Sequence, residues 1–544
     1  MSNMLPIPPL PYNEPVLGFL PGSPERAELK AKLAEMAAQI VEIPVVIDGR
    51  DIHTGDLGEC RMPHKHAHLL GTYHKAGAGE VKAAAAAARK AKKGWAAMPW
   101  QARAAIFLKA AELLAGPWRS AVNAATMLGQ SKTCFQAEID AACELIDFWR
   151  FNVSFAYDIM GEQPESAPGV WNMLEQRPLD GFVFAVTPFN FTSIAGNLPT
   201  APALMGNTVL WKPASSAVYS AYLLMQLLEE AGLPDGVINM IPGSGGQVGD
   251  PVLAHPELAG VHFTGSTAVF NGMWETIGRN IGTYGCYPRI VGETGGKDFV
   301  FAHASADPQA LVTALVRGAF EYQGQKCSAA SRAYIPNELW KTIRPRLLDE
   351  IKSIKMGDVT DFSNFMAAVI DRAAFENIKG YIDTARKRNS GAKIIAGGGC
   401  EDALGYFIEP TVIMADRPDF VTMREELFGP VLTVYVYDEQ DWLKTLRLCD
   451  RGSAYALTGA VFARDRAAIE QARAELEGAA GNFYVNDKPT GAVVGQQPFG
   501  GSRASGTNDK AGSYLNLTRW VSPRTIKETF DPPRDYRYPF MAKK

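Results

Sequence analysis

The chain has few cysteines, no long apolar run and no excess of charge of either sign. Its seven cysteines in 544 residues are odd in number and form no C-x-x-C pair, which argues against a disulfide framework and favours a reducing compartment. The longest apolar stretches, such as 181–186 and 431–437, are far shorter than the ~20 residues that a membrane helix needs. Because 54 basic and 58 acidic residues are interspersed, the sequence predicts neither a nucleic-acid partner nor membrane association.

The N-terminal segment also lacks targeting signals. Residues 1–15 are rich in proline and show neither the apolar core of a signal peptide nor the arginine-rich amphipathic pattern of a transit peptide. A cytoplasmic location is therefore expected. A mitochondrial matrix protein whose presequence is missing from this chain would look the same, so this alternative stays open.

Hydrophobic patterning predicts two α/β units behind a helical N-terminal part. A chain of this length, 47% hydrophobic and 21% charged, is expected to form two or three domains. Strands that alternate with helices predict right-handed βαβ units and a buried parallel sheet, which is typical of dinucleotide-binding domains. The helices predicted before residue 153 are 24–40, 80–98, 99–115 and 136–156. The strands predicted in the first unit are 182–188, 208–212, 238–241, 260–264 and 289–292. Those predicted in the second unit are 299–302, 331–335, 411–414, 431–437, 459–462 and 483–486.

A histidine run raises the question of a metal. His64, His66 and His68 alternate, so on a strand they would share one face and could gather an ion. No nearby Cys, Asp or further His completes a ligand set. We therefore favour an exposed polar strand or loop, and we predict no metal site.

Cys327 and Glu293 form the most informative pair in the chain. Cys327 lies in Gln-Lys-Cys-Ser, and Glu293 lies in Val-Gly-Glu-Thr-Gly-Gly-Lys, 34 residues earlier. A thiol is the natural group to attack an aldehyde, and a carboxylate can activate the water that later releases an acyl thioester. The two residues together therefore predict the catalytic pair of an aldehyde oxidation.

The order and spacing of these two segments resemble the catalytic segments of the aldehyde dehydrogenase superfamily. The resemblance implies an α/β fold with a Rossmann-type dinucleotide-binding domain, a second α/β catalytic domain and a small β oligomerisation flap. The implied NAD-binding domain comprises 1–158 and 179–290, and the implied catalytic domain comprises 291–500. Segments 159–178 and 512–544 would form the flap and the C-terminal tail, and a homodimer or a higher homo-oligomer is expected.

Asn190 follows the first predicted strand of the βαβ unit, in Thr-Pro-Phe-Asn-Phe. This places it at the carboxyl edge of the sheet, where ligands bind in open α/β folds. A side-chain amide there can donate to the oxygen that becomes negative when a thiolate attacks. By resemblance, Asn190 is the oxyanion donor, assisted by the backbone N–H of Cys327.

Four residues at strand ends are expected to bind NAD. Lys212 resembles the superfamily's ligand for the adenosine ribose, and Gly265 and Ser266 open a helix whose N–H groups favour a pyrophosphate. Ser215 occupies the position where many NAD-preferring relatives carry a Glu that repels the extra phosphate of NADP. Discrimination against NADP is therefore expected to be incomplete.

A later motif, Glu-Glu-Leu-Phe-Gly-Pro at 425–430, completes the expected cofactor site. By resemblance, Glu426 holds the nicotinamide ribose and Phe428 packs near the ring. A charged turn before a strand is the structural alternative. Members of the superfamily usually carry a Gly five residues after Gly265, whereas this chain has Phe270, as does one branch of the superfamily.

The segments 490–501 and 504–510 resemble the branch of the superfamily that oxidises L-glutamate γ-semialdehyde, and other segments extend this likeness over nearly the whole chain. A substrate ending in an α-amino acid needs anion donors at the far end of its pocket, and small residues offer backbone N–H groups there. The expected substrate-binding residues are Phe191, Ser328, Gly491, Ala492 and Phe499, in which the two phenylalanines wall the aliphatic chain.

The activity implied is NAD-dependent oxidation of L-glutamate γ-semialdehyde, in equilibrium with 1-pyrroline-5-carboxylate, to L-glutamate, as the second step of proline catabolism. A related enzyme for succinate semialdehyde or broad aliphatic aldehydes stays open. A CoA-acylating relative is less favoured because such enzymes commonly lack the base found here as Glu293. No stretch is long enough for the flavin-binding barrel of a bifunctional protein. An inactive binding relative would have lost the thiol or the carboxylate.

Overall fold

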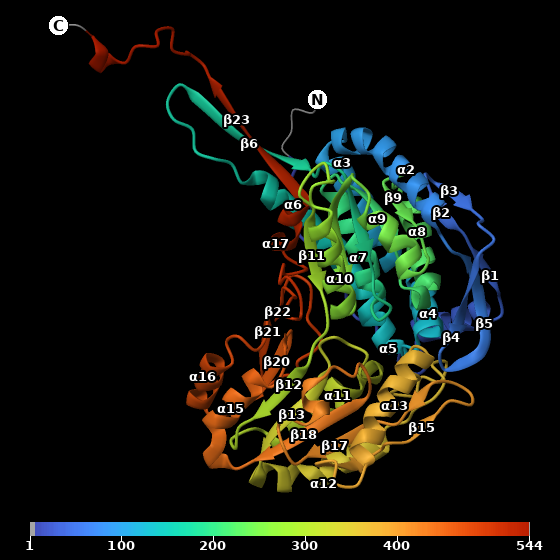
Figure 1. Ribbon diagram of the computed structural model, residues 1–544. Helices are drawn as coiled ribbons and strands as arrows, with labels where there is room; N and C mark the ends of the chain where they lie inside the picture. Colours follow the sequence, from blue (N-terminus) through green and yellow to red (C-terminus); the bar gives the residue numbers. More distant parts are fainter. Residues whose placement is uncertain (1–5, 543–544) are drawn as a thin grey trace.

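Two seven-stranded sheets, one above the other in Figure 1, organise the chain of this computed structural model, which describes residues 6–542. In the first sheet, the five strands from β11 to β9 run parallel, and β2 and β3 add an antiparallel edge. The spatial order of this sheet is β11 (Arg289–Glu293), β10 (Leu258–Thr264), β7 (Phe182–Val186), β8 (Thr208–Lys212), β9 (Ile238–Met240), β2 (Val45–Ile47) and β3 (Arg50–Ile52).

Strand order reverses next to β7 in this sheet. The chain proceeds from β7 to β8 and β9 on one side, and then returns to place β10 and β11 on the other side. Such a reversal opens a crevice at the carboxyl ends of the strands, where nucleotides bind in open α/β sheets. The fold therefore positions the loops after β7 and β10 for a ligand.

Helices cover the first sheet and form the N-terminal shell. Their apolar faces supply a large buried core together with the strands. The helices are α1 (Pro24–Ala37), α2 (Ala78–Ala97), α3 (Trp100–Ala115), α4 (Arg119–Gln130), α5 (Cys134–Ala137), α6 (Glu144–Gly161), α7 (Thr192–Leu204), α8 (Val218–Ala231), α9 (Asp250–Leu253) and α10 (Thr267–Arg279). A π-helical turn, η1 (Glu138–Cys143), joins α5 to α6.

The second sheet is parallel except for its edge strand β14. Its spatial order is β14 (Ala392–Ala396), β17 (Thr411–Ala415), β18 (Val431–Tyr437), β13 (Ala330–Pro336), β12 (Asp298–Ala302), β20 (Thr458–Phe462) and β21 (Asn482–Val485). The helices of this half are α11 (Pro308–Phe320), α12 (Asn337–Ser353), α13 (Arg372–Arg386), α14 (Val421–Arg424), α15 (Trp442–Arg451) and α16 (Arg466–Glu475). The predicted strands of both sheets are confirmed, with small shifts at their ends.

A two-stranded ribbon projects away from both sheets (Figure 1). Strand β6 (Val170–Pro178) pairs antiparallel with β23 (Val521–Thr529), which follows the short helix α17 (Tyr514–Leu517). The excursion predicted near residues 161–178 and the tail therefore pair with each other. Within residues 6–542, no helix is both long and apolar enough to cross a membrane.

The expectation that the N-terminal part is largely helical was incomplete. A three-stranded sheet of β1 (Val41–Ile43), β5 (Lys65–His74) and β4 (Leu57–Met62) lies there, and α4 was also missed. These strands carry glycine, histidine and charged residues, so their apolar alternation is weak in the sequence. His64 is buried rather than exposed, and it immediately precedes β5.

Candidate active site

A short linker brings the two predicted catalytic residues together. Glu293 ends β11 at the edge of the first sheet, and β12 begins at Asp298 inside the second sheet. Cys327 lies just before β13, the neighbour of β12. A Cβ added at Gly296 of the linker would lie 2.0 Å from the carbonyl oxygen of Cys327, so only glycine permits this approach. The thiol loop therefore rests directly on the linker.

Buried hydrogen bonds hold the loop before the thiol in an unusual conformation. Tyr322, Gln323 and Gly324 all have positive φ, at 50°, 54° and 66°. The Gln323 side chain donates to the carbonyl oxygens of Ser131 and Ala368 at 3.0 and 2.8 Å, and its own oxygen accepts from a backbone N–H. Left-handed residues other than glycine cost of order 1–3 kcal/mol each and persist where surrounding contacts enforce them.

The environment of Cys327 favours the neutral thiol at rest. Burial raises the pKa of this thiol well above its usual value, and the carboxyl groups of Asp298, Glu293 and Glu426 raise it further. These contributions also mean that Glu293 lies within electrostatic reach of the sulfur. Because the thiolate is the nucleophile, a proton acceptor must act before Cys327 can attack.

Glu293 has the properties of a group that can accept a proton from water. Burial raises the pKa of its carboxyl group well above the usual value, while the ammonium of Lys510 opposes this effect. Its Oε2 has no hydrogen-bond partner in the part of the chain that the structure describes. A Cβ at Gly500 would lie 2.9 Å from Oε1, so this glycine makes room for the carboxyl. Glu293 is thus available to accept a proton from a water molecule.

Asn190 lies beside the thiol loop. It is buried in the turn after β7, and its Nδ2 donates to the carbonyl oxygen of Gln325 at 3.0 Å. That carbonyl lies two residues before Cys327. Since a side-chain amide carries two N–H donors, one donor of Asn190 remains for an oxygen on a substrate bound to the sulfur.

The predicted cofactor residues lie at the carboxyl edge of the first sheet. Lys212 ends β8, and burial lowers the pKa of its ammonium to about 8. Ser215 begins the 3₁₀ turn η2 (Ser215–Ala217) that follows this strand, and it is exposed. Gly265 comes directly after β10, and the Ser266 hydroxyl caps α10 by accepting from the N–H of Val269 at 3.4 Å. All four border the crevice at which strand order reverses.

Phe270 replaces the usual glycine and has a packing role. Its ring stacks on Phe263 with centroids 5.3 Å apart, and a Cβ at Gly292 would lie 2.2 Å from the Phe270 ring. Phe270 therefore lies against the residue directly before Glu293. This contact supports the strand that carries the carboxyl.

Glu426 and Phe428 lie in the second half of the chain, beside the thiol loop. Both line a small cavity together with Cys327, and Glu426 Oε1 accepts from the N–H of Gly296 at 2.8 Å. Burial raises the pKa of Glu426 to about 7. The ring of Phe428 meets that of Phe189 edge to face, with centroids 5.8 Å apart. The motif is thus more than a charged turn, because its glutamate binds the linker beside the thiol.

The predicted substrate residues come from three segments. Ser328 donates to Thr490 Oγ1 at 2.9 Å, which ties the thiol loop to the segment of Gly491 and Ala492. Gly491 has a φ of 97°, a conformation suited to glycine. Phe191 follows Asn190, and the Lys132 ammonium lies 4.3 Å from the centre of its ring. Phe499 pairs its backbone with Ala511.

Several charged residues near the site were missed. Lys326, directly before Cys327, is buried, and its ammonium lies 3.5 Å from Glu321 and 3.8 Å from Asp140. Asp140 also pairs with Lys132. Because Lys326 directly precedes Cys327 in the sequence, it could have been predicted to lie near the site. Lys510 ends the segment 504–510, whose resemblance to the family predicts no charge next to Glu293.

The three histidines of the run bind separate partners. His64 bonds the Ser131 hydroxyl, while His66 and His68 bond the carbonyl oxygens of Asp402 and Ala37. They therefore do not converge on one point.

Another group, comprising Glu42, His53 and His74, does converge, because its ligand atoms lie within 4.8 Å of one another. His74 Nδ1 accepts from the N–H of Gly55, so in the neutral ring Nε2 carries the proton. That Nε2 faces Glu42 Oε1 at 2.8 Å. Hydrogen bonds among these side chains account for their close approach, without a metal ion.

The chain is similar to proteins of one known family. The aldehyde dehydrogenase family model matches residues 54–526. A Dictyostelium discoideum protein named mitochondrial delta-1-pyrroline-5-carboxylate dehydrogenase is 53% identical over 98% of this chain and 96% of its own length. A Mus musculus protein of the same name is 49% identical over 97% of this chain and 94% of its own. The crystal structure of a Mycobacterium tuberculosis delta-pyrroline-5-carboxylate dehydrogenase bound with NAD is 55% identical, with a TM-score of 0.96 over 100% of both chains.

Proposed function

Because the chain belongs to the aldehyde dehydrogenase family, we propose that it oxidises L-glutamate γ-semialdehyde, the open form of 1-pyrroline-5-carboxylate, to L-glutamate. This is the second step of proline catabolism, and NAD is the hydride acceptor. The observation that carries the proposal is the contact of the thiol loop with the linker after Glu293, which holds nucleophile and base within reach of one crevice.

Chemistry begins at Cys327. Its sulfur, once deprotonated, forms a bond to the aldehyde carbon, and the carbonyl oxygen becomes an oxyanion. The remaining N–H of Asn190 and the backbone N–H of Cys327 donate to this oxygen. Loss of one such donor typically costs 10²–10³ in turnover, about 2.7–4 kcal/mol.

Glu293 acts in the second half of the reaction. It takes a proton from a water molecule as the water oxygen bonds to the acyl carbon of the thioester, and the carbon–sulfur bond then breaks. L-Glutamate leaves and the thiol is restored. The unpartnered Oε2 and the room provided by Gly500 suit a carboxyl that must meet water.

The residues at the sheet edge fit NAD. Gly265 and the exposed N-terminus of α10 would face the pyrophosphate, Lys212 and Ser215 would face the adenosine ribose, and Glu426 would hold the nicotinamide ribose. When bound, NAD supplies the acceptor for the hydride that leaves the substrate carbon. Burial lowers the pKa of Lys212 to about 8, so at pH 7 this side chain is still mostly an ammonium group and can donate to a ribose hydroxyl.

The far end of the substrate is proposed to meet the segment after Thr490. Gly491 and Ala492 offer backbone N–H groups to the α-carboxylate, and the Ser328 hydroxyl adds a donor. Phe191 and Phe499 enclose the aliphatic middle and so keep the carbonyl near the sulfur.

We further propose a homodimer or a higher homo-oligomer that uses the projecting ribbon of β6 and β23. A ribbon of two strands is marginally stable alone, so its extension away from the body is best explained by a partner subunit. We propose a cytoplasmic location, with the mitochondrial matrix as the alternative because the Dictyostelium and mouse relatives carry that word in their names. Immunoblots of fractionated host cells would distinguish the two.

One spectrophotometric experiment tests the activity. Formation of NADH is followed with pyrroline-5-carboxylate, succinate semialdehyde and propanal as substrates, and the first is repeated with NADP. We expect the highest kcat/KM with pyrroline-5-carboxylate and NAD. A higher value with succinate semialdehyde or propanal would assign the chain to another substrate. Formation of acyl-CoA after addition of CoA would reveal thioester transfer instead of hydrolysis.

A further inference from the structure

An N-terminal strap, residues 12–19, contacts the segment that is proposed to bind the α-carboxylate of the substrate. The strap contains no helix or strand, so side-chain contacts decide where it lies. Asn13 provides the contact between the two segments. Its Nδ2 donates to the carbonyl oxygen of Val494 at 2.9 Å, and its Oδ1 accepts from the side chain of Gln496 at 2.8 Å. Asn13 and Val494 are 481 positions apart in the chain.

The same side chain attaches the strap to α6. Asn13 Nδ2 also donates to Oδ2 of Asp147 at 2.8 Å, and Asp147 Oδ1 accepts from the backbone N–H of Glu14 at 2.6 Å. Asp147 is buried on α6. Since an amide side chain has two N–H hydrogens and one oxygen, every polar group of Asn13 is in use. Asn13 therefore joins α6 to the loop of Val494.

Two buried arginines hold the next residue of the strap. The Glu14 carboxylate accepts from Arg119 at 2.5 Å and from Arg150 at 2.7 Å. Arg119 also donates to the carbonyl oxygen of Pro15 at 2.8 Å. Salt screens buried ion pairs much less than exposed ones. The backbone that carries Asn13 is thus fixed by its neighbours.

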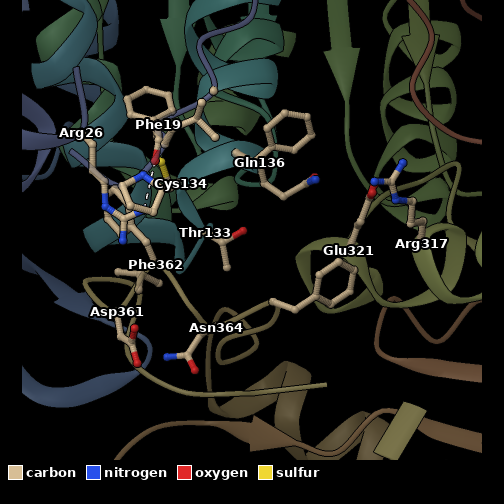
Figure 2. A pocket seen from close by; sticks show the side chains of 16 residues that line it. Phe19, Arg26, Thr133, Cys134, Gln136, Arg317, Glu321, Asp361, Phe362 and Asn364 are labelled. Atoms are coloured by element: carbon tan, nitrogen blue, oxygen red, sulfur yellow. Dashed lines mark hydrogen bonds between the residues drawn. The ribbon is translucent and has the colours of Figure 1, made fainter. Parts of the chain in front are cut away.

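The other end of the strap is anchored as well. The Phe19 side chain is buried, and Arg26 donates to the carbonyl oxygen of Phe19 at 3.0 Å. Figure 2 shows both residues beside a cavity of about 400 Å³. None of the residues proposed above for catalysis lines that cavity, so this anchor is separate from the active site.

The loop that Asn13 contacts has little internal support. Residues 490–498 form no helix or strand. Gly491 and Gly495 have φ values of 97° and 80°, and glycine leaves the backbone free at both points. Such a segment needs contacts from outside to hold its peptide N–H groups in fixed directions.

Two outside contacts flank the proposed carboxylate donors. On one side, Thr490 Oγ1 accepts from Ser328 at 2.9 Å. On the other side, the carbonyl oxygen of Val494 accepts from Asn13. The N–H groups of residues 491 and 492 lie between these two points of the chain. Loss of either contact would free one end of the donor segment.

We propose that Asn13 is a positioning residue that sets the selectivity for an aldehyde bearing a carboxylate, an inference that rests on the function proposed above. By fixing the carbonyl group of Val494, Asn13 holds the N–H groups of Gly491 and Ala492 in place for the α-carboxylate. Its partners lie on α6 and in the loop, so it acts on binding of the far end of the substrate. The chemistry at Cys327 does not depend on it.

Asn13→Ala tests this role with two aldehydes, pyrroline-5-carboxylate and propanal, of which propanal lacks the carboxylate. We expect KM for pyrroline-5-carboxylate to rise about tenfold, as for a weakened hydrogen bond to a charged group, with kcat within about twofold of wild type. The kcat/KM for propanal and the KM for NAD should be unchanged. Asn364→Ala is the matched control, because it removes an amide that donates to the carbonyl oxygen of Asp358 in another loop.

A double variant separates positioning of the loop from attachment of the strap. In Asn13→Asp with Asp147→Asn, the amide and the carboxylate exchange places, so a hydrogen bond between the strap and α6 is kept. The carboxylate at position 13 cannot donate to Val494. We expect a Tm near that of wild type together with the raised KM of Asn13→Ala.

The outcomes distinguish this inference from the proposed function. A wild-type enzyme that does not prefer pyrroline-5-carboxylate to propanal would refute the function itself. If the wild type has that preference, an unchanged KM in Asn13→Ala overturns the role of Asn13. An equal loss with both aldehydes also overturns it, because a damaged fold does not discriminate between them. A wild-type KM in the double variant would show that attachment of the strap to α6 suffices, and it would exclude the contact with Val494.

Discussion

Burial raises the pKa of both the Cys327 thiol and the Glu293 carboxyl, which favours the uncharged form of each group. A resting thiol is protected from oxidation, which proceeds through the thiolate. Substrate and cofactor must therefore create the conditions for proton transfer.

Replacement of Cys327, the proposed nucleophile, should abolish chemistry without loss of cofactor binding. We expect Cys327→Ser to abolish NADH formation from pyrroline-5-carboxylate, because a serine hydroxyl at this position has no base strong enough to ionise it. NAD binding, measured by fluorescence titration, should be unchanged. Cys449→Ser is the control, because this cysteine is buried in the core of the second sheet; this variant should retain wild-type turnover. Turnover near wild type in Cys327→Ser would remove this residue from the mechanism.

The pH dependence of turnover should report the Glu293 carboxyl. Its pKa is raised above the ordinary value by burial, so activity should rise with pH through a limb that lies above the usual range of glutamate. Lys510 lowers this pKa, so Lys510→Met should shift the limb to higher pH, while Lys510→Arg should restore it. The profile of kcat against pH measures the effect.

Glu293→Gln should remove the same limb and slow thioester release. A burst of NADH followed by a slow steady state is the expected signature. A shift of the limb to lower pH in Lys510→Met would contradict the assigned charge coupling.

At the scale of elements, the close contact between linker and thiol loop depends on Gly296. A Cβ there would lie 2.0 Å from the Cys327 carbonyl oxygen, so Gly296→Ala must push the loop away. We expect a fall in kcat of about 10²-fold, typical of a displacement near 1 Å in a reacting group. Gly272→Ala on α10 is the control, because a Cβ there meets nothing within 4 Å. Equal kcat in the two variants would show that the contact has no catalytic consequence.

The ribbon of β6 and β23 yields a prediction about assembly. Deletion of residues 521–544 leaves the hydrogen bonds of β6 unpaired along its whole length. We expect the truncated protein to shift to a smaller species in analytical ultracentrifugation. Arg524→Ala, which removes only the exposed ion pair with Glu175, is the milder control and should leave the mass unchanged. A truncated protein with the mass of the full chain would exclude the ribbon from the interface.

At the scale of the whole molecule, the sequence predicted elements whose pattern is local. The buried strands were found because continuous apolar runs between turns, such as 182–186 and 431–437, are typical of parallel sheets. The thiol and the carboxyl were found because their flanking residues resemble a family. Both kinds of signal lie within a few residues along the chain.

The features that were missed depend on distant contacts. Gln323 holds the thiol loop by bonding Ser131, which is 192 positions away. Lys510, near the C-terminus, lowers the pKa of Glu293. The N-terminal sheet of β1, β5 and β4 was missed because its strands show little apolar periodicity. A single sequence shows which residue types are present, but the partner of a buried charge is decided by folding.

The linker of residues 294–297 supports the thiol loop and joins the two halves of the molecule. A rotation of one half against the other, of the kind that admits or releases a dinucleotide, would have its axis beside the chemistry. Opening would then lift Glu293 away from the sulfur, and closure would return it. With this coupling, the acyl-enzyme would be hydrolysed only in the closed state. Nucleotide exchange and product formation would then alternate in each cycle.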